Sequence, residues 1–175
     1  MNGREKRVSV NRVSYIDGMR RLAASVTIVT TGQAPDRFGL TATAVTSVSA
    51  DPPTLLACIN RDSDSFHPIL RNRCFAVNLL RPEHGELASR FGGRFAESGE
   101  PRFAAGNWVA GQHGVPVLAD ALATFECALE TVHDGASHGI LLGQVLSVTM
   151  NGGGSPLLWF DGDLARATRI VPTGD

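Results

Sequence analysis

Apolar and polar positions alternate along most of this chain, and the alternation predicts a protein built mainly from β-strands. Strands are expected at 26–31, 40–49, 54–59, 74–80, 123–132, 139–150 and 157–160. Helical spacing of apolar residues is found at 15–24 and at 67–72, the second after the N-cap candidates Asp64 and Ser65. Pro82 favours the start of a third helix that ends near Phe91. The pattern predicts an antiparallel barrel with a few peripheral helices.

One long segment, residues 92–116, has no clear periodicity. It is rich in glycine and contains Pro101, Trp108 and Pro116. Segments of this length without regular structure are usually functional or part of an interface. We therefore expect a functional or interface loop here.

Length and charge limit the possible classes of protein. The chain has 175 residues, of which 43% are hydrophobic, so one domain is expected, over residues 15–170. Arg4, Lys6, Arg7 and Arg12 form a basic arm, and residues 1–14 are expected to be disordered. The formal net charge of −1 argues against nucleic-acid binding. The sequence has no long apolar run and no apolar signal core. We therefore expect a cytoplasmic protein that does not associate with membranes.

Several kinds of chemistry are disfavoured by the residue types. Cys58, Cys74 and Cys127 form no Cys-x-x-Cys pair, and each lies in an apolar run, so they are interpreted as small core residues. The five histidines do not pair at helical spacing, which argues against a metal site. Lys6 is the sole lysine, which argues against Walker-type phosphate binding and Schiff-base chemistry.

Residues 39–53 are the most informative segment. They combine small residues and hydroxyls in a strand pattern that ends at Asp51-Pro52-Pro53, where a ladder cannot continue. Small side chains let a ligand approach the backbone, so the segment suits the wall of a site for a flat polar ligand. An ordinary amphipathic strand with a polar outer face would have the same pattern, and this segment alone does not separate the two.

The order of several such segments is more specific than any one of them. They are 19–31, 39–53, 59–65, 75–80, 88–91, 137–145 and 156–160. Together they resemble the short-chain flavin reductase family, over about residues 15–165. The resemblance implies an FMN-binding split barrel, usually a homodimer. It implies an NAD(P)H-dependent enzyme that transfers a hydride from NADH or NADPH to FMN or FAD and supplies reduced flavin to a separate monooxygenase.

The resemblance also implies site residues. By family position, the residues expected to contact the flavin are Thr41, Ala42, Thr43, Ala44, Ser47, Ser49, Asn60, Ser63, Ser65, Arg90 and Phe91. His138 is expected to face the nicotinamide as the catalytic residue, with Trp159 nearby as a further cofactor contact. The chain departs from the family at three places. The usual Gly-Asp-His is Ala136-Ser137-His138 here, and the usual Thr-Ala-Asn-Ser is Thr-Ala-Thr-Ala at 41–44. The usual Leu-Leu-Tyr with a following glycine and aromatic residue is replaced at 157–164, where Trp159 keeps an aromatic ring and Leu164 loses one.

Two alternatives remain open. One is a protein of the same fold that stores or senses flavin without turnover. The other is a serine hydrolase, because residues 135–139 match the Gly-x-Ser-x-Gly motif around Ser137. Against the hydrolase, the motif connects two predicted strands rather than a strand and a helix, and no histidine follows His138.

Overall fold

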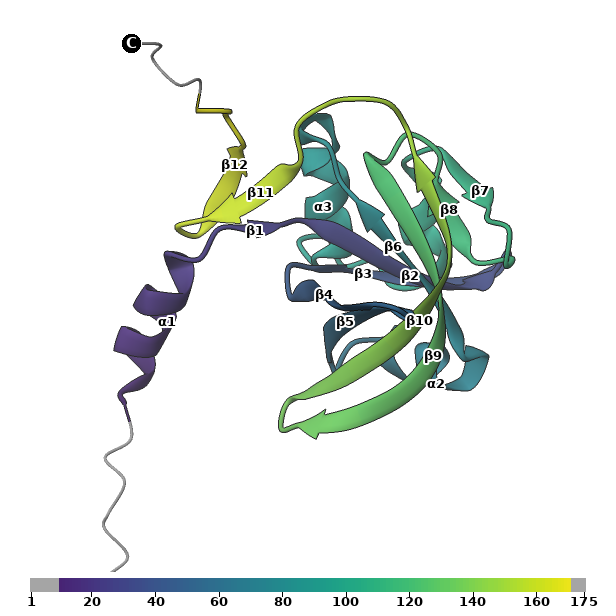
Figure 1. The fold of residues 1–175 in the computed structure, drawn as a ribbon, viewed down its shortest axis with the longest axis horizontal. Coiled ribbons are helices and arrows are strands. Elements are labelled where there is room, and N and C mark those ends of the chain that lie inside the picture. Colours follow the sequence, from purple (N-terminus) through teal and green to yellow (C-terminus); the bar gives the residue numbers. More distant parts are fainter. Residues whose placement is uncertain (1–9, 171–175) are drawn as a thin grey trace, which may run out of the picture.

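A seven-stranded antiparallel sheet forms the body of the protein, which a computed structural model describes over residues 10–170 (Figure 1). Its strand order is β3–β2–β6–β9–β10–β5–β4. The bounds are β2 (Thr27–Gln33), β3 (Asp36–Ala42), β4 (Val45–Ala50), β5 (Pro53–Asn60), β6 (Cys74–Leu79), β9 (Ala123–Gly135) and β10 (His138–Met150). The mainly β architecture with peripheral helices that the pattern predicted is confirmed.

The sheet curls into an open barrel, since its two edge strands, β3 and β4, are consecutive in the chain. The sequence predicted one strand over 40–49, and this was wrong. The chain leaves β3 after Ala42, passes through Thr43 and Ala44, and begins β4 at Val45 on the other edge. The Ala44 carbonyl accepts a hydrogen bond from the Cys58 N–H, which attaches this connection to β5.

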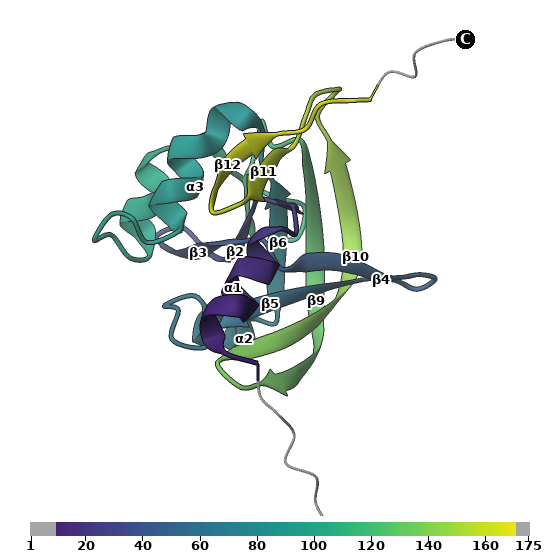
Figure 2. The ribbon, with the colours of Figure 1, turned by 90° about the vertical axis from the view of Figure 1, so that its left-hand side faces the viewer.

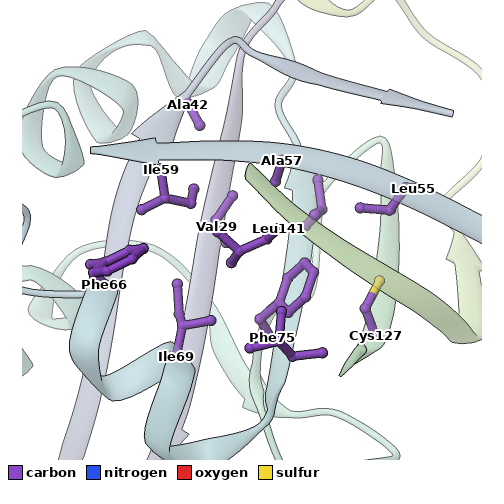
Figure 3. Close-up of a cluster of buried hydrophobic side chains, with 12 residues drawn as sticks. Val29, Ala42, Leu55, Ala57, Ile59, Phe66, Ile69, Phe75, Cys127 and Leu141 are labelled. Carbon is purple, nitrogen blue, oxygen red and sulfur yellow. The ribbon is translucent and has the colours of Figure 1, made fainter. Parts of the chain in front are cut away.

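Apolar side chains from the inner face of the sheet fill the barrel (Figure 3). Val29, Ile59, Phe75 and Leu141 are among its fully buried members. Helix α2 (Phe66–Asn72) adds Phe66 and Ile69 to this core, so it closes one side of the barrel.

A second core lies under a short 3₁₀ turn, η1 (Pro82–His84), and helix α3 (Gly85–Phe91). Segment 92–116, expected as a loop, contains η2 (Glu100–Ala104) and β7 (Trp108–Ala110), which pairs with β8 (Pro116–Leu118). Phe103 and Trp108 pack against Phe91 at ring distances of 5.1 and 5.3 Å. The segment is therefore ordered by packing on its own chain.

A smaller unit lies beside the second core, to which it contributes Leu157 and Leu164. It contains helix α1 (Arg12–Arg20), which has no buried side chain, and a sheet of β1 (Ala24–Ser25), β11 (Leu157–Phe160) and β12 (Asp163–Arg166) (Figures 1 and 2). Residues 12–14, expected in a disordered arm, belong to this helix. The rest of that predicted arm, apart from 10 and 11, lies outside the described residues. Among residues 10–170, no helix is long and apolar enough to cross a membrane.

Candidate functional site

A polar cavity of about 440 Å³ opens beside β3, where the end of β5, the turn before α2 and the end of α3 meet. Its lining residues are Leu40, Thr41, Asn60, Asp62, Ser63, Asp64, Phe91, Gly92, Gly93, Ser98 and Arg102. We refer to it as the polar cavity, and to residues 94–102, which cover one side of it, as the strap.

Four of the residues assigned to flavin contacts line this cavity: Thr41, Asn60, Ser63 and Phe91. They come from three segments of the chain: β3, the end of β5 with the turn that follows it, and α3. The Thr41 hydroxyl donates to the Ala88 carbonyl at 2.7 Å, so this residue joins β3 to α3. The fold therefore brings these four predicted positions together around one space.

Asp64 holds the strap against the turn before α2. Its carboxylate accepts hydrogen bonds from the Ser98 hydroxyl at 2.7 Å, the Gly99 N–H at 3.1 Å and Arg102 Nη1 at 3.2 Å. The Ser65 hydroxyl also donates to it. Burial opposes ionisation of Asp64, but these hydrogen bonds and the positive charge of Arg102 outweigh it and lower its pKa below the usual 3.8. The carboxylate is therefore charged at neutral pH.

Arg90 lies at the end of α3, directly before the cavity-lining residues Phe91 to Gly93. Its Nη1 donates to the Glu97 carboxylate, and its guanidinium lies 5.2 Å from the centre of the Phe95 ring. Arg90 Nε is buried and has no hydrogen-bond partner within the described residues. A buried donor without an acceptor is unfavourable, and Arg90 itself is not among the residues that line the polar cavity.

Other residues assigned to flavin contacts lie elsewhere. The Ala42 side chain is part of the barrel core, so only its backbone could face a ligand. Thr43 and Ala44 form the connection between β3 and β4. Ser65 is fully buried and its hydroxyl is used by Asp64, so the structure does not place it in the polar cavity.

Ser47 and Ser49 line a different, mostly apolar cavity of about 360 Å³, which we call the apolar cavity. Its walls come from β1, β2, β4, β5, β6, β9 and β10. They include Val45, Leu55, Val77, Phe125, Val145 and Val148. Strands β4 and β10 also carry the exposed apolar side chains Val48, Leu146 and Met150.

His138 is the first residue of β10, at the tip of the β9–β10 hairpin. In the sheet it pairs with Asn60 of β5, so the hairpin tip lies next to the polar cavity. His138 is exposed, and its Nδ1 is 2.9 Å from the Ser137 hydroxyl. Trp159, expected near His138, is on β11, which lies at the opposite end of the molecule from the hairpin tip in both views (Figures 1 and 2). One chain therefore does not bring the two together.

The hydrolase alternative gains no support from this geometry. Ser137 lies in a tight turn between two antiparallel strands. Asp134, a carboxylate of the same hairpin, accepts hydrogen bonds from Arg61 and from the Ala136 N–H rather than orienting His138. A nucleophilic serine needs a base that is itself oriented by a third group.

The three cysteines are free thiols, of which Cys127 is buried and Cys58 and Cys74 are half-buried. Burial, with Cys74 and Glu126 nearby, raises the pKa of Cys127 to about 12. Its thiol is therefore protonated at neutral pH and is a poor nucleophile.

The sequence analysis missed four residues of this site: Glu97, Ser98, Gly99 and Arg102. Ser98, Gly99 and Arg102 act through contacts with the distant residues Asp64 and Gly39. Glu97 acts through contacts with Arg90 and Arg102. No local pattern in the chain marks such contacts. The adjacent glycines 92 and 93, after a helix, were the one available signal, because glycine favours a close approach of backbone to ligand.

Comparisons with known proteins find relatives over most of the chain. A family model described as "Flavin reductase like domain" matches residues 19–168. An "FMN reductase (NADH) RutF" from Agrobacterium fabrum is 42% identical over 149 residues, which cover 85% of this chain and 84% of that protein.

Two solved structures have the same fold. The NADH:FAD oxidoreductase SgcE6 of Streptomyces globisporus C-1027 is 28% identical, with a TM-score of 0.83 over 96% of each chain. BorF, the flavin reductase component of a bacterial two-component tryptophan halogenase, is 28% identical with a TM-score of 0.83, over 91% of this chain and all of BorF. The expected split-barrel fold is confirmed by these neighbours.

Proposed function

This chain belongs to the flavin reductase-like family, and we propose from that premise that it reduces FMN with NADH and holds the flavin at the polar cavity. The enzyme class, an NAD(P)H-dependent flavin reductase, follows from the family match over residues 19–168 and the 42% identity to an NADH-dependent FMN reductase. FMN and NADH are the flavin and the donor in the name of that relative.

The observation that carries the location is that four predicted flavin contacts, Thr41, Asn60, Ser63 and Phe91, line the polar cavity. The Ser63 hydroxyl and the Asn60 side-chain amide can donate to a ligand there, whereas the Thr41 hydroxyl already donates to Ala88. Donors of this kind suit the ribityl and phosphate groups of a flavin, since they favour anionic and hydroxyl acceptors. Gly93, with φ of +82°, adds backbone without a side chain to this wall. The residues present therefore fit the cofactor that the family implies.

The chemistry of hydride transfer would be supplied by the flavin and the nicotinamide, and the protein would orient them and exclude water. The cavity wall, attached through Thr41 to Ala88, fixes one side of this arrangement. His138 supports the other side, because its pairing with Asn60 keeps the hairpin tip beside the cavity. We assign His138 to positioning the nicotinamide. Trp159 would take part from a partner subunit or through a later conformational change.

A homodimer is part of the proposal. The apolar cavity and the exposed side chains Val48, Leu146 and Met150 form one apolar surface on β4 and β10, and α1 is an unpacked helix. Apolar surfaces of this kind on a protein of 175 residues favour association, and a two-fold dimer can cover the same patch on both copies. Sedimentation at micromolar concentration should give the mass of a dimer, and a monomer would contradict this part.

The reduced flavin would be released to a separate monooxygenase or halogenase. BorF is such a flavin reductase component, in its case of a two-component tryptophan halogenase. A cytoplasmic location is also proposed. It is supported by the nicotinamide donor and by three free thiols, which a reducing compartment maintains.

The test is NADH oxidation at 340 nm with FMN, FAD and riboflavin supplied in turn, together with flavin bleaching at 450 nm without oxygen. The proposal expects oxidation of NADH that depends on added or retained flavin. Flavin binding without any turnover would favour the storage alternative and overturn the reductase assignment.

A further inference from the structure

Among the described residues that line the polar cavity, Arg102 is the one cation. The other charged residues of the lining are the carboxylates Asp62 and Asp64. The Arg102 side chain is only 11% exposed, so solvent screens its charge less than that of a surface arginine. An anionic group that enters this space therefore meets one arginine and two aspartates.

Two of the three guanidinium nitrogens of Arg102 are used by the protein. Nε donates to the Glu97 carbonyl at 2.8 Å. Nη1 donates to the Gly39 carbonyl at 2.8 Å and to the Asp64 carboxylate at 3.2 Å. These bonds connect the guanidinium to the strap, to β3 and to the turn before α2, so its orientation is fixed before a ligand binds. A donor that is already oriented loses little conformational entropy on binding.

The third nitrogen of Arg102, Nη2, is unused. It makes no hydrogen bond within residues 10–170, where the bonds of this side chain come from Nε and Nη1. Among the non-exposed residues of 10–170, the one buried side-chain nitrogen or oxygen without a partner is Arg90 Nε, so Nη2 is not buried. Nη2 therefore keeps accessible surface on a side chain that is otherwise nearly buried and lines the polar cavity. The unused donor is thus within reach of a ligand in that cavity.

Asp64 weakens the cation without blocking this donor. Its carboxylate, 24% exposed, pairs with Arg102 through Nη1 and leaves Nη2 free. The pair is neutral as a whole, so it presents an oriented N–H group without a net positive charge. Such a group attracts a phosphate less strongly than an unpaired arginine does. Removing the aspartate charge should therefore strengthen the attraction.

We propose that Arg102 is a specificity-determining residue that binds the phosphate of FMN through Nη2, and that Asp64 limits the strength of this contact. The proposal rests on the proposed function and deepens it. Riboflavin has the same ring and ribityl chain but no phosphate, so it gains nothing from Arg102. The polar cavity therefore distinguishes FMN from riboflavin through one arginine, and Asp64 keeps the bound FMN exchangeable.

The test is equilibrium binding of FMN and of riboflavin, measured by quenching of flavin fluorescence, with the ratio of the two affinities as the readout. Arg102→Gln should lower FMN affinity about tenfold and leave riboflavin within about twofold of the native protein. Asp64→Asn keeps the shape of the side chain and removes its charge, so FMN should bind about fivefold more tightly, again with riboflavin within about twofold. Both changes should shrink in high salt, because they are electrostatic.

The opposite signs separate an effect of charge from damage to the strap. Arg102 and Asp64 both hold the strap, so damage would shift FMN affinity in the same direction in both variants and would weaken riboflavin as well. The double variant should have the affinity ratio of Arg102→Gln alone, because Asp64 acts through Arg102. If circular dichroism shows that Arg102→Gln does not fold, Asp64→Asn still decides, since an unchanged ratio there overturns the proposal.

Two controls match these variants in charge. Arg94→Gln removes a cation from an exposed position of the same strap that does not line the polar cavity. Asp62→Asn removes an exposed carboxylate that does line it. Each should change the affinity ratio by less than about twofold, because exposed charges are screened by solvent.

The proposal is overturned where Arg102→Gln folds and keeps the native ratio, where both variants shift the ratio in the same direction, or where either control matches its partner variant. Each of these outcomes leaves the proposed function intact. A native protein that binds neither flavin overturns the proposed function itself, so the two failures are distinguishable.

Discussion

The two sides of the proposed site differ in how firmly the chain holds them. On the polar-cavity side, a half-buried carboxylate, Asp64, receives four hydrogen bonds and holds the strap in place. On the hairpin side, Arg61 and Asp134 form an ion pair whose side chains are 41% and 78% exposed, and His138 contacts only the neighbouring Ser137 hydroxyl among the side chains described. Exposed pairs contribute little to stability, whereas partly buried ones with several hydrogen bonds contribute more.

The difference suggests a division of roles. A preorganised wall suits the flavin, because ordering the wall costs nothing at the moment of binding. An open hairpin tip suits a donor that must enter and leave in every turnover. If this comparison is right, substitutions on the cavity side should affect folding, and those on the hairpin side should affect catalysis.

The largest effect is expected from Phe91→Ala. Phe91 is fully buried, lines the polar cavity and packs on Phe103 and Trp108, so its removal leaves a hole in the second core. The free energy of unfolding should fall by about 3–5 kcal/mol in urea titrations. Phe160→Ala, at an exposed position, is the control and should cost less than about 1 kcal/mol. Equal losses in the two variants would contradict the assignment of Phe91 to the core.

Asp64→Asn should cost about 2 kcal/mol of unfolding free energy at pH 7, because it removes the charge that Arg102 faces in a half-buried site. The pKa of Asp64 is lowered in the folded protein, so its contribution is full above its unfolded pKa, near 3.8, and is lost as the pH falls through the lowered value. The native protein and the variant should therefore begin to converge in stability as the pH falls below about 3.8, and should become equal only below the lowered pKa of Asp64.

The control for this prediction is Asp62→Asn, at an exposed neighbouring position, which should change stability by less than about 0.5 kcal/mol at either pH. A stability difference between native protein and Asp64→Asn that persists unchanged at acid pH would show that the charge of Asp64 is not the cause.

On the hairpin side, His138→Ala should lower kcat/KM for NADH about tenfold, or about 1.4 kcal/mol, because a misplaced nicotinamide transfers its hydride less well. The dissociation constant of FMN should change less than about twofold, since His138 lies outside the polar cavity. Stopped-flow reduction and equilibrium binding check the two quantities separately. If this variant has the same NADH kinetics as the native protein, His138 is not part of the nicotinamide site.

The smallest effect is expected from Ser137→Ala. The hydroxyl lies 2.9 Å from His138 Nδ1, but both residues are exposed and water can replace the contact. Flavin reduction should stay within about twofold, or about 0.4 kcal/mol. The hydrolase alternative requires Ser137 for ester cleavage, so p-nitrophenyl ester hydrolysis that is present in the native protein and lost in this variant would revive it.

Most strands could be predicted from the sequence because alternation of polarity is a local signal. Strand β11, at Leu157–Phe160, has the predicted bounds, while β5 differs from its predicted bounds by one residue at each end and β6 by one residue at its C-terminal end. The division between β3 and β4 was missed because Thr43 and Ala44 fit a strand as well as a connection. Strands β7 and β8 were missed because three-residue strands are too short for a period to appear.

The site was predicted less completely, and the reason is physical. Thr41, Asn60, Ser63 and Phe91 were found through an ordered family pattern, and the fold does place them around one cavity. Glu97 and Arg102 were not found, because their roles depend on ion pairs and on contacts across folded segments. Ser65 was assigned to the flavin as a hydroxyl before a helix, and burial shows that it serves Asp64 instead.

Hydrogen–deuterium exchange with FMN and then NAD⁺ tests the division of roles most directly. FMN alone should slow exchange in peptides covering 39–43, 60–65 and 88–102, and leave the hairpin tip at 133–140 unchanged. Adding NAD⁺, which cannot donate a hydride, should then slow exchange at the tip. Protection of the tip by FMN alone, without protection around the polar cavity, would contradict the account.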